Sequence, residues 1–179
     1  MTKQPKRALD RLSDPEYLSG ISDLPIEELR QRRAECSSVE EELSYARRLL
    51  QGKLDILSHE IKGRAEGGQT SFESLIAKLP TILADEDSTS VGRHMNVVLP
   101  KNFEKQRREV ERIASESIFA KLPELGPEEL EDLATRLTEC ETQISEERRT
   151  VQDVLDVLNS EVVRRYREGQ QDVSSLLPT

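Results

Sequence analysis

The chain has 179 residues, of which 34% are charged and 3% are aromatic, and it contains no tryptophan. This composition excludes a thick globular core, because large apolar side chains are too few to fill one. The formal net charge of −9 at pH 7 argues against a general nucleic-acid binder, since attraction to phosphate needs a basic face. Long helices that bury a narrow apolar seam are the structure that this composition favours.

The beginning of the chain is polar. Residues 1–22 contain Pro5 and Pro15 and are expected to form a flexible arm. This region has no apolar stretch of the signal-peptide type, and no later segment approaches the length of a membrane span. We therefore expect a cytoplasmic protein without membrane contact. Cys36 and Cys140 fit no metal-ligand spacing and are expected to be reduced, half-buried helix residues.

A first long helix is expected within residues 23–69. Apolar or small side chains recur once per heptad in this range, and the Gly67-Gly68 pair ends the pattern. The seam consists of Leu29, Cys36, Leu43, Leu50 and Leu57, with Leu54 and Ile61 in the companion position.

The connector, residues 70–122, is expected to hold short helices around an acidic, serine-rich loop at 84–90. Its apolar side chains have no seam of their own, so they pack either on the long helices or against a partner. These side chains are Phe72, Leu75, Ile76, Leu79, Phe103, Val110 and Ile113.

A second long helix is expected within residues 123–170, followed by a flexible tail at 171–179. Its start is marked by Gly126-Pro127 and two glutamates, and its end by Gly169. The seam consists of Leu130, Leu137, Ile144, Val151 and Leu158, with Leu155 and Val162 in the companion position.

The two long helices are an internal repeat with a constant offset of 101 residues. Identical residues recur at this offset well beyond the centre of each helix, at Leu24, Glu27, Glu28, Leu29, Leu54, Leu57, Glu60, Arg64 and Gly68. An antiparallel hairpin would set the copies side by side about an approximate two-fold axis, although the long connector leaves parallel pairing open. The predicted fold class is all-α: a long antiparallel two-helix coiled coil from an internal repeat, with short connecting helices.

Five polar side chains form a stripe along the edge of each seam. At 100° per residue they occupy less than about a quarter of the helix circumference. The first copy is Glu40, Ser44, Arg47, Gln51 and Asp55, and the second is Glu141, Ser145, Arg148, Gln152 and Asp156. One interpretation is a salt-bridge network that joins Glu40 and Arg47 to Arg148 and Glu141 and fixes the helix register.

The other interpretation is a ligand site. The arginine fork can hold a phosphate or the O6/N7 edge of guanine, and carboxylates can accept hydrogen bonds from guanine N1–H and its amino group. A mixed acidic and basic stripe therefore suits a guanine nucleotide better than a bare phosphate. Its duplication about a two-fold axis suits a symmetric ligand, of which a cyclic dinucleotide of two guanines is one.

The spacing Glu-x3-Ser-x2-Arg-x3-Gln-x3-Asp, present in both copies without a departure, resembles the signature of the RsiG family of actinobacterial anti-sigma factors. The resemblance implies that a stacked pair of cyclic di-GMP molecules binds to the coiled coil and that the loaded form sequesters WhiG, a sigma factor of the flagellar and sporulation type.

The same resemblance implies roles for the motif residues. Arg47 and Arg148 would grip guanine or phosphate, Asp55 and Asp156 would accept hydrogen bonds from guanine, and the remaining motif residues would orient the ligand. Arg48 and Arg149 also repeat, although they lie outside the signature. They are candidate phosphate contacts or simply exposed helix residues.

The unrepeated connector is the expected place for a sigma-binding surface, and the acidic balance of the chain complements the basic DNA-binding surfaces of a sigma factor. We expect no direct DNA binding, because the formal net charge is −9. We also expect no enzyme, because His59 and His94 have no neighbouring nucleophile or metal set and no glycine-rich phosphate loop is present. The rival hypothesis is a coiled-coil adaptor whose polar stripe only sets the helix register.

Overall fold

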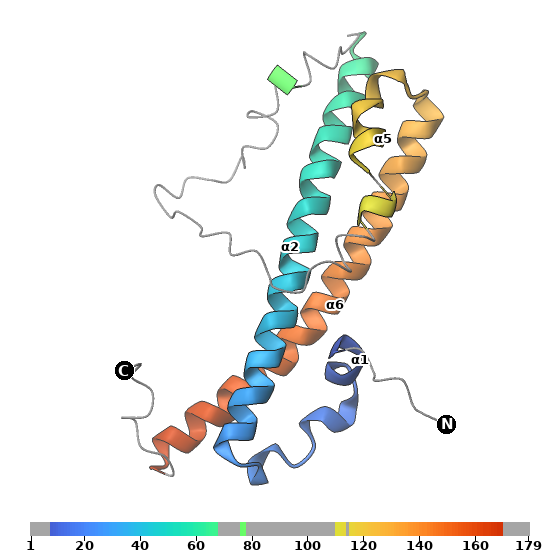
Figure 1. The fold of residues 1–179 in the computed structure, drawn as a ribbon. Helices are drawn as coiled ribbons and strands as arrows, with labels where there is room; N and C mark the ends of the chain where they lie inside the picture. The colour runs from blue at the N-terminus through green and yellow to red at the C-terminus, as the bar shows by residue number, and fades with distance from the viewer. Residues whose placement is uncertain (1–7, 68–75, 78–109, 114, 170–179) are drawn as a thin grey trace, which may run out of the picture. The chain divides into compact units, whose positions relative to one another are not determined.

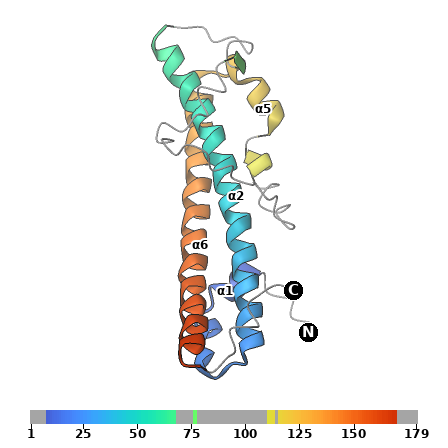
Figure 2. The same ribbon diagram turned by 90° about the vertical axis from the view of Figure 1, so that its left-hand side faces the viewer.

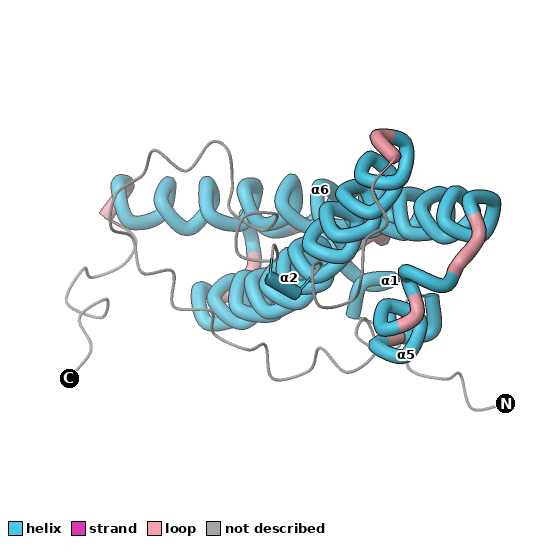
Figure 3. The backbone as a smooth tube through the Cα atoms, turned by 90° about the horizontal axis from the view of Figure 1, so that it is seen from above, coloured by secondary structure: helices cyan, strands magenta, loops and turns pink. Residues whose placement is uncertain are grey.

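The computed structural model describes residues 8–67, 76–77, 110–113 and 115–169, and every regular element in these ranges is a helix (Figure 3). Two of them are long, α2 (Ile26–Ala65) and α6 (Pro127–Arg167). The short ones are α1 (Ala8–Leu12), the 3₁₀ helices η1 (Pro15–Leu18) and η2 (Ile21–Asp23), α5 (Glu116–Ala120) and the 3₁₀ helix η3 (Leu122–Glu124). The all-α prediction is confirmed.

The predicted main seam is buried in both long helices. On α2 its members are Leu29, Cys36, Leu43, Leu50 and Leu57, and on α6 they are Leu130, Leu137, Ile144, Val151 and Leu158. Of the companion positions, only Val162 is buried, whereas Leu54, Ile61 and Leu155 are half-buried. A second row of buried apolar side chains lies three residues after the main seam, so the companion position falls mainly one residue earlier than predicted. Its members are Val39 and Ala46 on α2 and Leu133, Cys140 and Val154 on α6.

The chain divides into two compact units. Unit 1 contains the described residues up to Glu41 and from Glu146 onward, and unit 2 contains the described residues from Glu42 to Ser145. Each unit holds a segment of α2 packed against a segment of α6 (Figures 1 and 2).

The pairing of α2 with α6 is antiparallel within each unit. In unit 1, Arg30 donates a hydrogen bond to the Tyr166 hydroxyl, and Glu40 pairs with Arg148. In unit 2, Arg47 pairs with Glu141. Arg64, further along α2, donates a hydrogen bond to the carbonyl of Leu125, which lies just before the start of α6. Within each unit, the residue numbers of the contacts on the α6 side decrease as the residue numbers on α2 increase, which confirms the antiparallel prediction.

The expectation of a flexible arm over residues 1–22 is wrong for residues 8–22. The Leu12 side chain is 1% exposed, and the Asp14 carboxylate caps η1 by accepting from the Glu16 backbone N–H at 3.2 Å. Arg32 of α2 donates to the Tyr17 carbonyl at 2.5 Å and lies over the Tyr17 ring. Helices of three to five residues are too short to show a hydrophobic period, so the sequence pattern does not reveal them.

The internal repeat extends into these short helices. At the same offset of 101, η1 corresponds to α5 and η2 to η3, and α1 corresponds to the helical residues 110–113. Leu12 and its counterpart Ile113 are both buried, and Asp14 and its counterpart Ser115 are both N-caps. Residues 110–113 and 115–122 of the connector are therefore a second copy of the segment that precedes α2, which corrects the expectation of an unrepeated connector.

Both cysteines are more buried than expected. Cys36 is 0% exposed and Cys140 is 9% exposed, so both belong to the buried core and neither is half-buried. Burial is the main cause that raises the pKa of the Cys36 thiol to about 11. A buried thiol of this kind packs as a small apolar side chain and is a weak nucleophile.

A buried Glu–Arg pair anchors the turn before α2 in unit 1. Arg165 Nε donates to Glu161 Oε1 at 2.8 Å, and its Nη2 donates to the Ile21 carbonyl at 2.8 Å. Its Nη1 donates to the Leu24 carbonyl. The guanidinium thus satisfies backbone carbonyls that precede the helix, while Glu161 balances its charge.

The same arrangement recurs in unit 2 before α6. Arg64 Nε donates to Glu60 Oε1 at 2.6 Å, and its two Nη groups donate to the carbonyls of Leu122 and Leu125 at 2.6 and 2.5 Å. The Glu60 side chain is fully buried. We call these two pairs the Arg64 clamp and the Arg165 clamp. They explain why Glu60 and Arg64 recur as Glu161 and Arg165.

Removal of a clamp should destabilise the chain strongly. We expect Arg165→Ala to lower the free energy of unfolding by about 3 kcal/mol, because it leaves partly buried carbonyls without donors and breaks a buried ion pair. Urea unfolding followed by circular dichroism measures this. The control is Arg136→Ala, which removes an exposed pair with Asp132 at 3.6 Å and should cost less than about 1 kcal/mol. Equal effects of the two substitutions would contradict a structural role for the clamp.

The Arg165 clamp should also make stability depend on pH. Hydrogen bonds from Arg164 and Arg165 lower the pKa of Glu161 from 4.5 to about 2. The ionised carboxylate therefore stabilises the fold fully above about pH 4.5, and this contribution is lost as the pH falls toward about 2. Urea midpoints measured between pH 6 and pH 3 should show the advantage of the parent chain over Glu161→Gln shrinking on acidification. A constant difference would contradict the lowered pKa.

Candidate ligand-binding site

The motif residues have matching exposure in the two copies. The glutamate, serine, arginine and glutamine are half-buried in both, and the aspartates, Asp55 and Asp156, are exposed in both. This placement follows from a stripe at the edge of a buried seam, where each side chain has one side against the partner helix and one side toward water. The exposed aspartates leave two acceptors open to solvent.

In unit 1, Glu40 of the first copy meets two residues of the second copy. Arg148 Nη1 donates to Glu40 Oε1 at 3.3 Å, and Gln152 Nε2 donates to the same oxygen at 3.1 Å. The Glu40 and Arg148 side chains are 20% and 25% exposed. We call these three residues the Glu40 cluster.

In unit 2, the roles of the copies are exchanged. Arg47 of the first copy faces Glu141 of the second, with Nη1 and Oε1 3.8 Å apart. Ser145 Oγ donates to Glu141 Oε1 at 2.8 Å. These three residues form the Glu141 cluster. Each cluster thus joins the glutamate of one motif copy to the arginine of the other, as antiparallel pairing requires.

The two motif arginines share a further feature. The Nε atoms of Arg47 and Arg148 are both buried and have no hydrogen-bond partner among the described residues. A buried N–H without a partner costs about 1–3 kcal/mol. The clamp arginines differ in that their Nε groups are bonded to carboxylates, while Glu60 Oε2 in the Arg64 clamp is likewise buried without a partner among the described residues.

The remaining candidates fall into three groups. Arg48 and Arg149 are exposed on α2 and α6, next to the motif arginines. Of the apolar connector residues, Val110 and Ile113 are buried, whereas Ile76 is 49% exposed. Phe72, Leu75, Leu79 and Phe103 lie outside the described residues, as does the acidic loop at 84–90.

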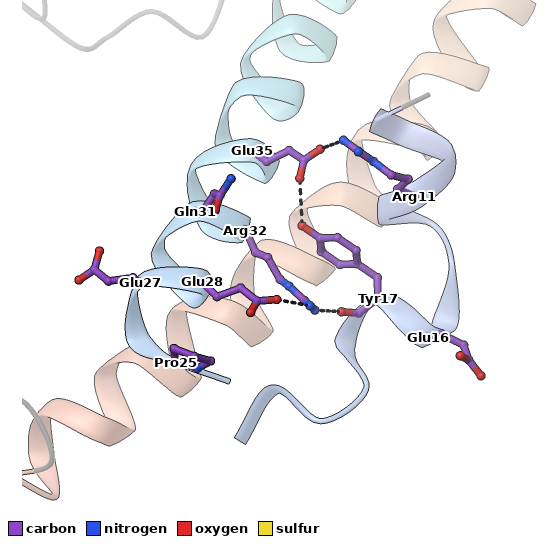
Figure 4. Close-up of a pocket in the computed structure, with 9 residues that line it drawn as sticks. All are labelled: Arg11, Glu16, Tyr17, Pro25, Glu27, Glu28, Gln31, Arg32 and Glu35. Carbon is purple, nitrogen blue, oxygen red and sulfur yellow. Dashed lines mark hydrogen bonds and ion pairs between the residues drawn. The ribbon is translucent and has the colours of Figure 1, made fainter. Parts of the chain in front are cut away.

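Unit 1 contains a groove that no sequence pattern predicted. It has a volume of about 590 Å³, and its nine lining residues, labelled in Figure 4, come from the N-terminal short helices and the start of α2. Its charges are largely paired with one another: Arg11 binds Glu35, and Arg32 binds Glu28 at 2.7 Å. Tyr17 shows a raised pKa, caused mainly by burial. The groove contains no motif residue.

The described residues hold no group of three or more histidine, cysteine, aspartate or glutamate side chains placed to bind a metal ion. No helix in the described part of the chain has the length and apolarity needed to cross a membrane.

The fold is an all-helical module built on paired, duplicated helices. The chain belongs to the RsiG-like family, whose model matches residues 5–83 and 116–179. This is a family of anti-sigma factors, so a sigma factor is the class of partner and transcription is the process that the protein regulates. A search among curated proteins finds no match to the chain.

The two clusters should contribute little to folding stability. Their ion pairs are partly exposed and no shorter than 3.3 Å, so we expect Arg148→Ala to change the free energy of unfolding by less than about 1 kcal/mol and to keep the helix content. Urea unfolding followed by far-ultraviolet circular dichroism measures both. The positive control is Leu158→Ala in the buried seam, which should cost about 2–5 kcal/mol. A loss of similar size for Arg148→Ala would favour a register-fixing role.

Proposed function

We propose that this protein binds cyclic di-GMP through the two repeated motifs and, when loaded, sequesters a sigma factor of the WhiG type and so blocks transcription. The observation that carries the proposal is the matching exposure of the motif residues in the two copies. In each copy the arginine, Arg47 or Arg148, is partly accessible and the aspartate, Asp55 or Asp156, is exposed. Membership in an anti-sigma family supports the regulatory part.

The chemistry of the motif residues fits guanine. An arginine fork can donate two hydrogen bonds to guanine O6 and N7 or to a phosphate, and a carboxylate can accept from N1–H and the amino group. Asp55 and Asp156 are exposed and can accept in this way. Because each group occurs twice, the proposed ligand is a stacked pair of cyclic di-GMP, with Arg48 and Arg149 as secondary phosphate contacts.

The proposed partner is recognised in part by charge. The chain carries a formal net charge of −9, and a sigma factor needs basic surfaces to contact DNA. Occlusion of those surfaces would block transcription without direct contact between this protein and DNA. The proposed function is binding without catalysis, in the cytoplasm, where sigma factors act.

Calorimetric titration of the parent chain with cyclic di-GMP, GTP and cyclic di-AMP tests the ligand. We expect saturable binding of cyclic di-GMP alone. The double variant Arg47→Ala with Arg148→Ala should weaken binding by at least about 30-fold, since each arginine–guanine contact is worth about 1–3 kcal/mol.

The matched control removes two exposed arginines from the same helices outside the motif, Arg33→Ala with Arg136→Ala. It changes the net charge by the same amount and should keep the parental affinity. If the motif variant bound as tightly as this control, the proposed site would be wrong.

A second candidate function is a coiled-coil adaptor whose polar stripe only sets the helix register. The crossed Glu–Arg pairs favour it, because such pairs join two helices in one alignment. Pull-down of the sigma factor with and without cyclic di-GMP separates the two functions. The adaptor would capture the sigma factor equally in both conditions, whereas the sensor would capture it only with nucleotide.

A further inference from the structure

The glutamate of each motif forms an ion pair with the arginine of the other copy. Glu40 pairs with Arg148, and Glu141 pairs with Arg47, each within one unit. A single helix cannot produce this pairing, because Glu40 and Arg47 lie seven residues apart on α2, about 10 Å along the helix axis. Each motif arginine therefore takes its carboxylate neighbour from the opposite copy.

Two further motif residues act on the glutamates. Gln152 donates to the carboxylate of Glu40, and Ser145 donates to the carboxylate of Glu141. In both clusters one polar side chain fixes the carboxylate and the carboxylate faces one guanidinium group. Three of the five motif residue types thus take part in holding an arginine.

We propose that Glu40 and Glu141 are positioning residues, each of which holds the arginine of the opposite motif copy ready for the nucleotide, with Gln152 and Ser145 holding the carboxylates. This inference rests on the proposed cyclic di-GMP site and assigns different roles to its residues. The arginines and the exposed aspartates contact the ligand, and the glutamates act through the arginines.

The physical reason is the flexibility of arginine. Fixing one long side chain on binding costs about 0.5–1.5 kcal/mol, and a neighbouring carboxylate reduces that cost by restricting the side chain beforehand. A guanidinium has five N–H donors, so a contact between Nη1 and a glutamate leaves further donors for a ligand. The partial exposure of Arg148 and Arg47, 25% and 32%, leaves room for such a contact.

Binding measurements on paired variants of the full-length chain test the proposal. Glu40→Gln keeps the shape of the side chain and removes its charge, and it should weaken cyclic di-GMP binding by about 3- to 10-fold. In an Arg148→Ala background the same substitution should have less than about a 2-fold effect, because its target is gone. In an Arg47→Ala background its full effect should persist. Glu141→Gln should show the reverse dependence.

Unfolding free energies and helix content of each variant serve as controls, because a structural role would change them without the crossed pattern of affinities. Additive effects in the Arg148→Ala background, or tighter binding by Glu40→Gln, would overturn the positioning role while leaving the nucleotide site intact. Absence of cyclic di-GMP binding by the parent chain would overturn the proposed function, and this inference with it.

Discussion

Burial of a narrow apolar seam along α2 and α6 is the constraint on which the rest of this structure depends. With 3% aromatic residues the chain has too few large apolar side chains to fill a thick core, so its long helices can bury only a narrow seam. A narrow seam leaves its edges close to water and close to the partner helix at once. Polar side chains at such an edge can pair across helices while one side stays accessible, which is the position of Arg47 and Arg148.

Two kinds of Glu–Arg pair occur in the same repeat, and their surroundings separate their roles. In the clamps, Arg64 and Arg165 bond to backbone carbonyls as well as to a buried carboxylate, so the nitrogens involved have well-formed partners. In the clusters, the arginines lie 3.3 and 3.8 Å from a partly exposed carboxylate, and their Nε atoms have no partner among the described residues. The first arrangement suits stability, and in the second the partial exposure of the guanidinium groups leaves Nη donors for the proposed ligand.

The sequence was sufficient to predict the two long helices, the main seam, the repeat and the antiparallel pairing, because each depends on a period or an offset that many residues share. It did not predict the short helices at 8–23, since a helix of a few residues is specified by a cap such as Asp14 and by tertiary contacts such as that between Tyr17 and Arg32. The clamps were visible only as the repeated pair Glu60 and Arg64. Their backbone acceptors carry no side-chain signal, so the role of the pair required the structure. The ligand-binding role of the motif residues remains a prediction.

The crossed clusters also constrain how the two halves of a duplicated gene can diverge. Duplication ordinarily leaves one copy free to change while the other keeps the original role. Here Arg148 of one copy faces Glu40 of the other, so a change in either half alters a cluster that both halves build. Elsewhere the two copies differ in sequence. Tyr17 corresponds to Ile118 in the second copy, and Arg32, which contacts Tyr17, corresponds to Leu133. The two copies are thus free to specialise in the helices that flank the motif, but at the clusters they must change together.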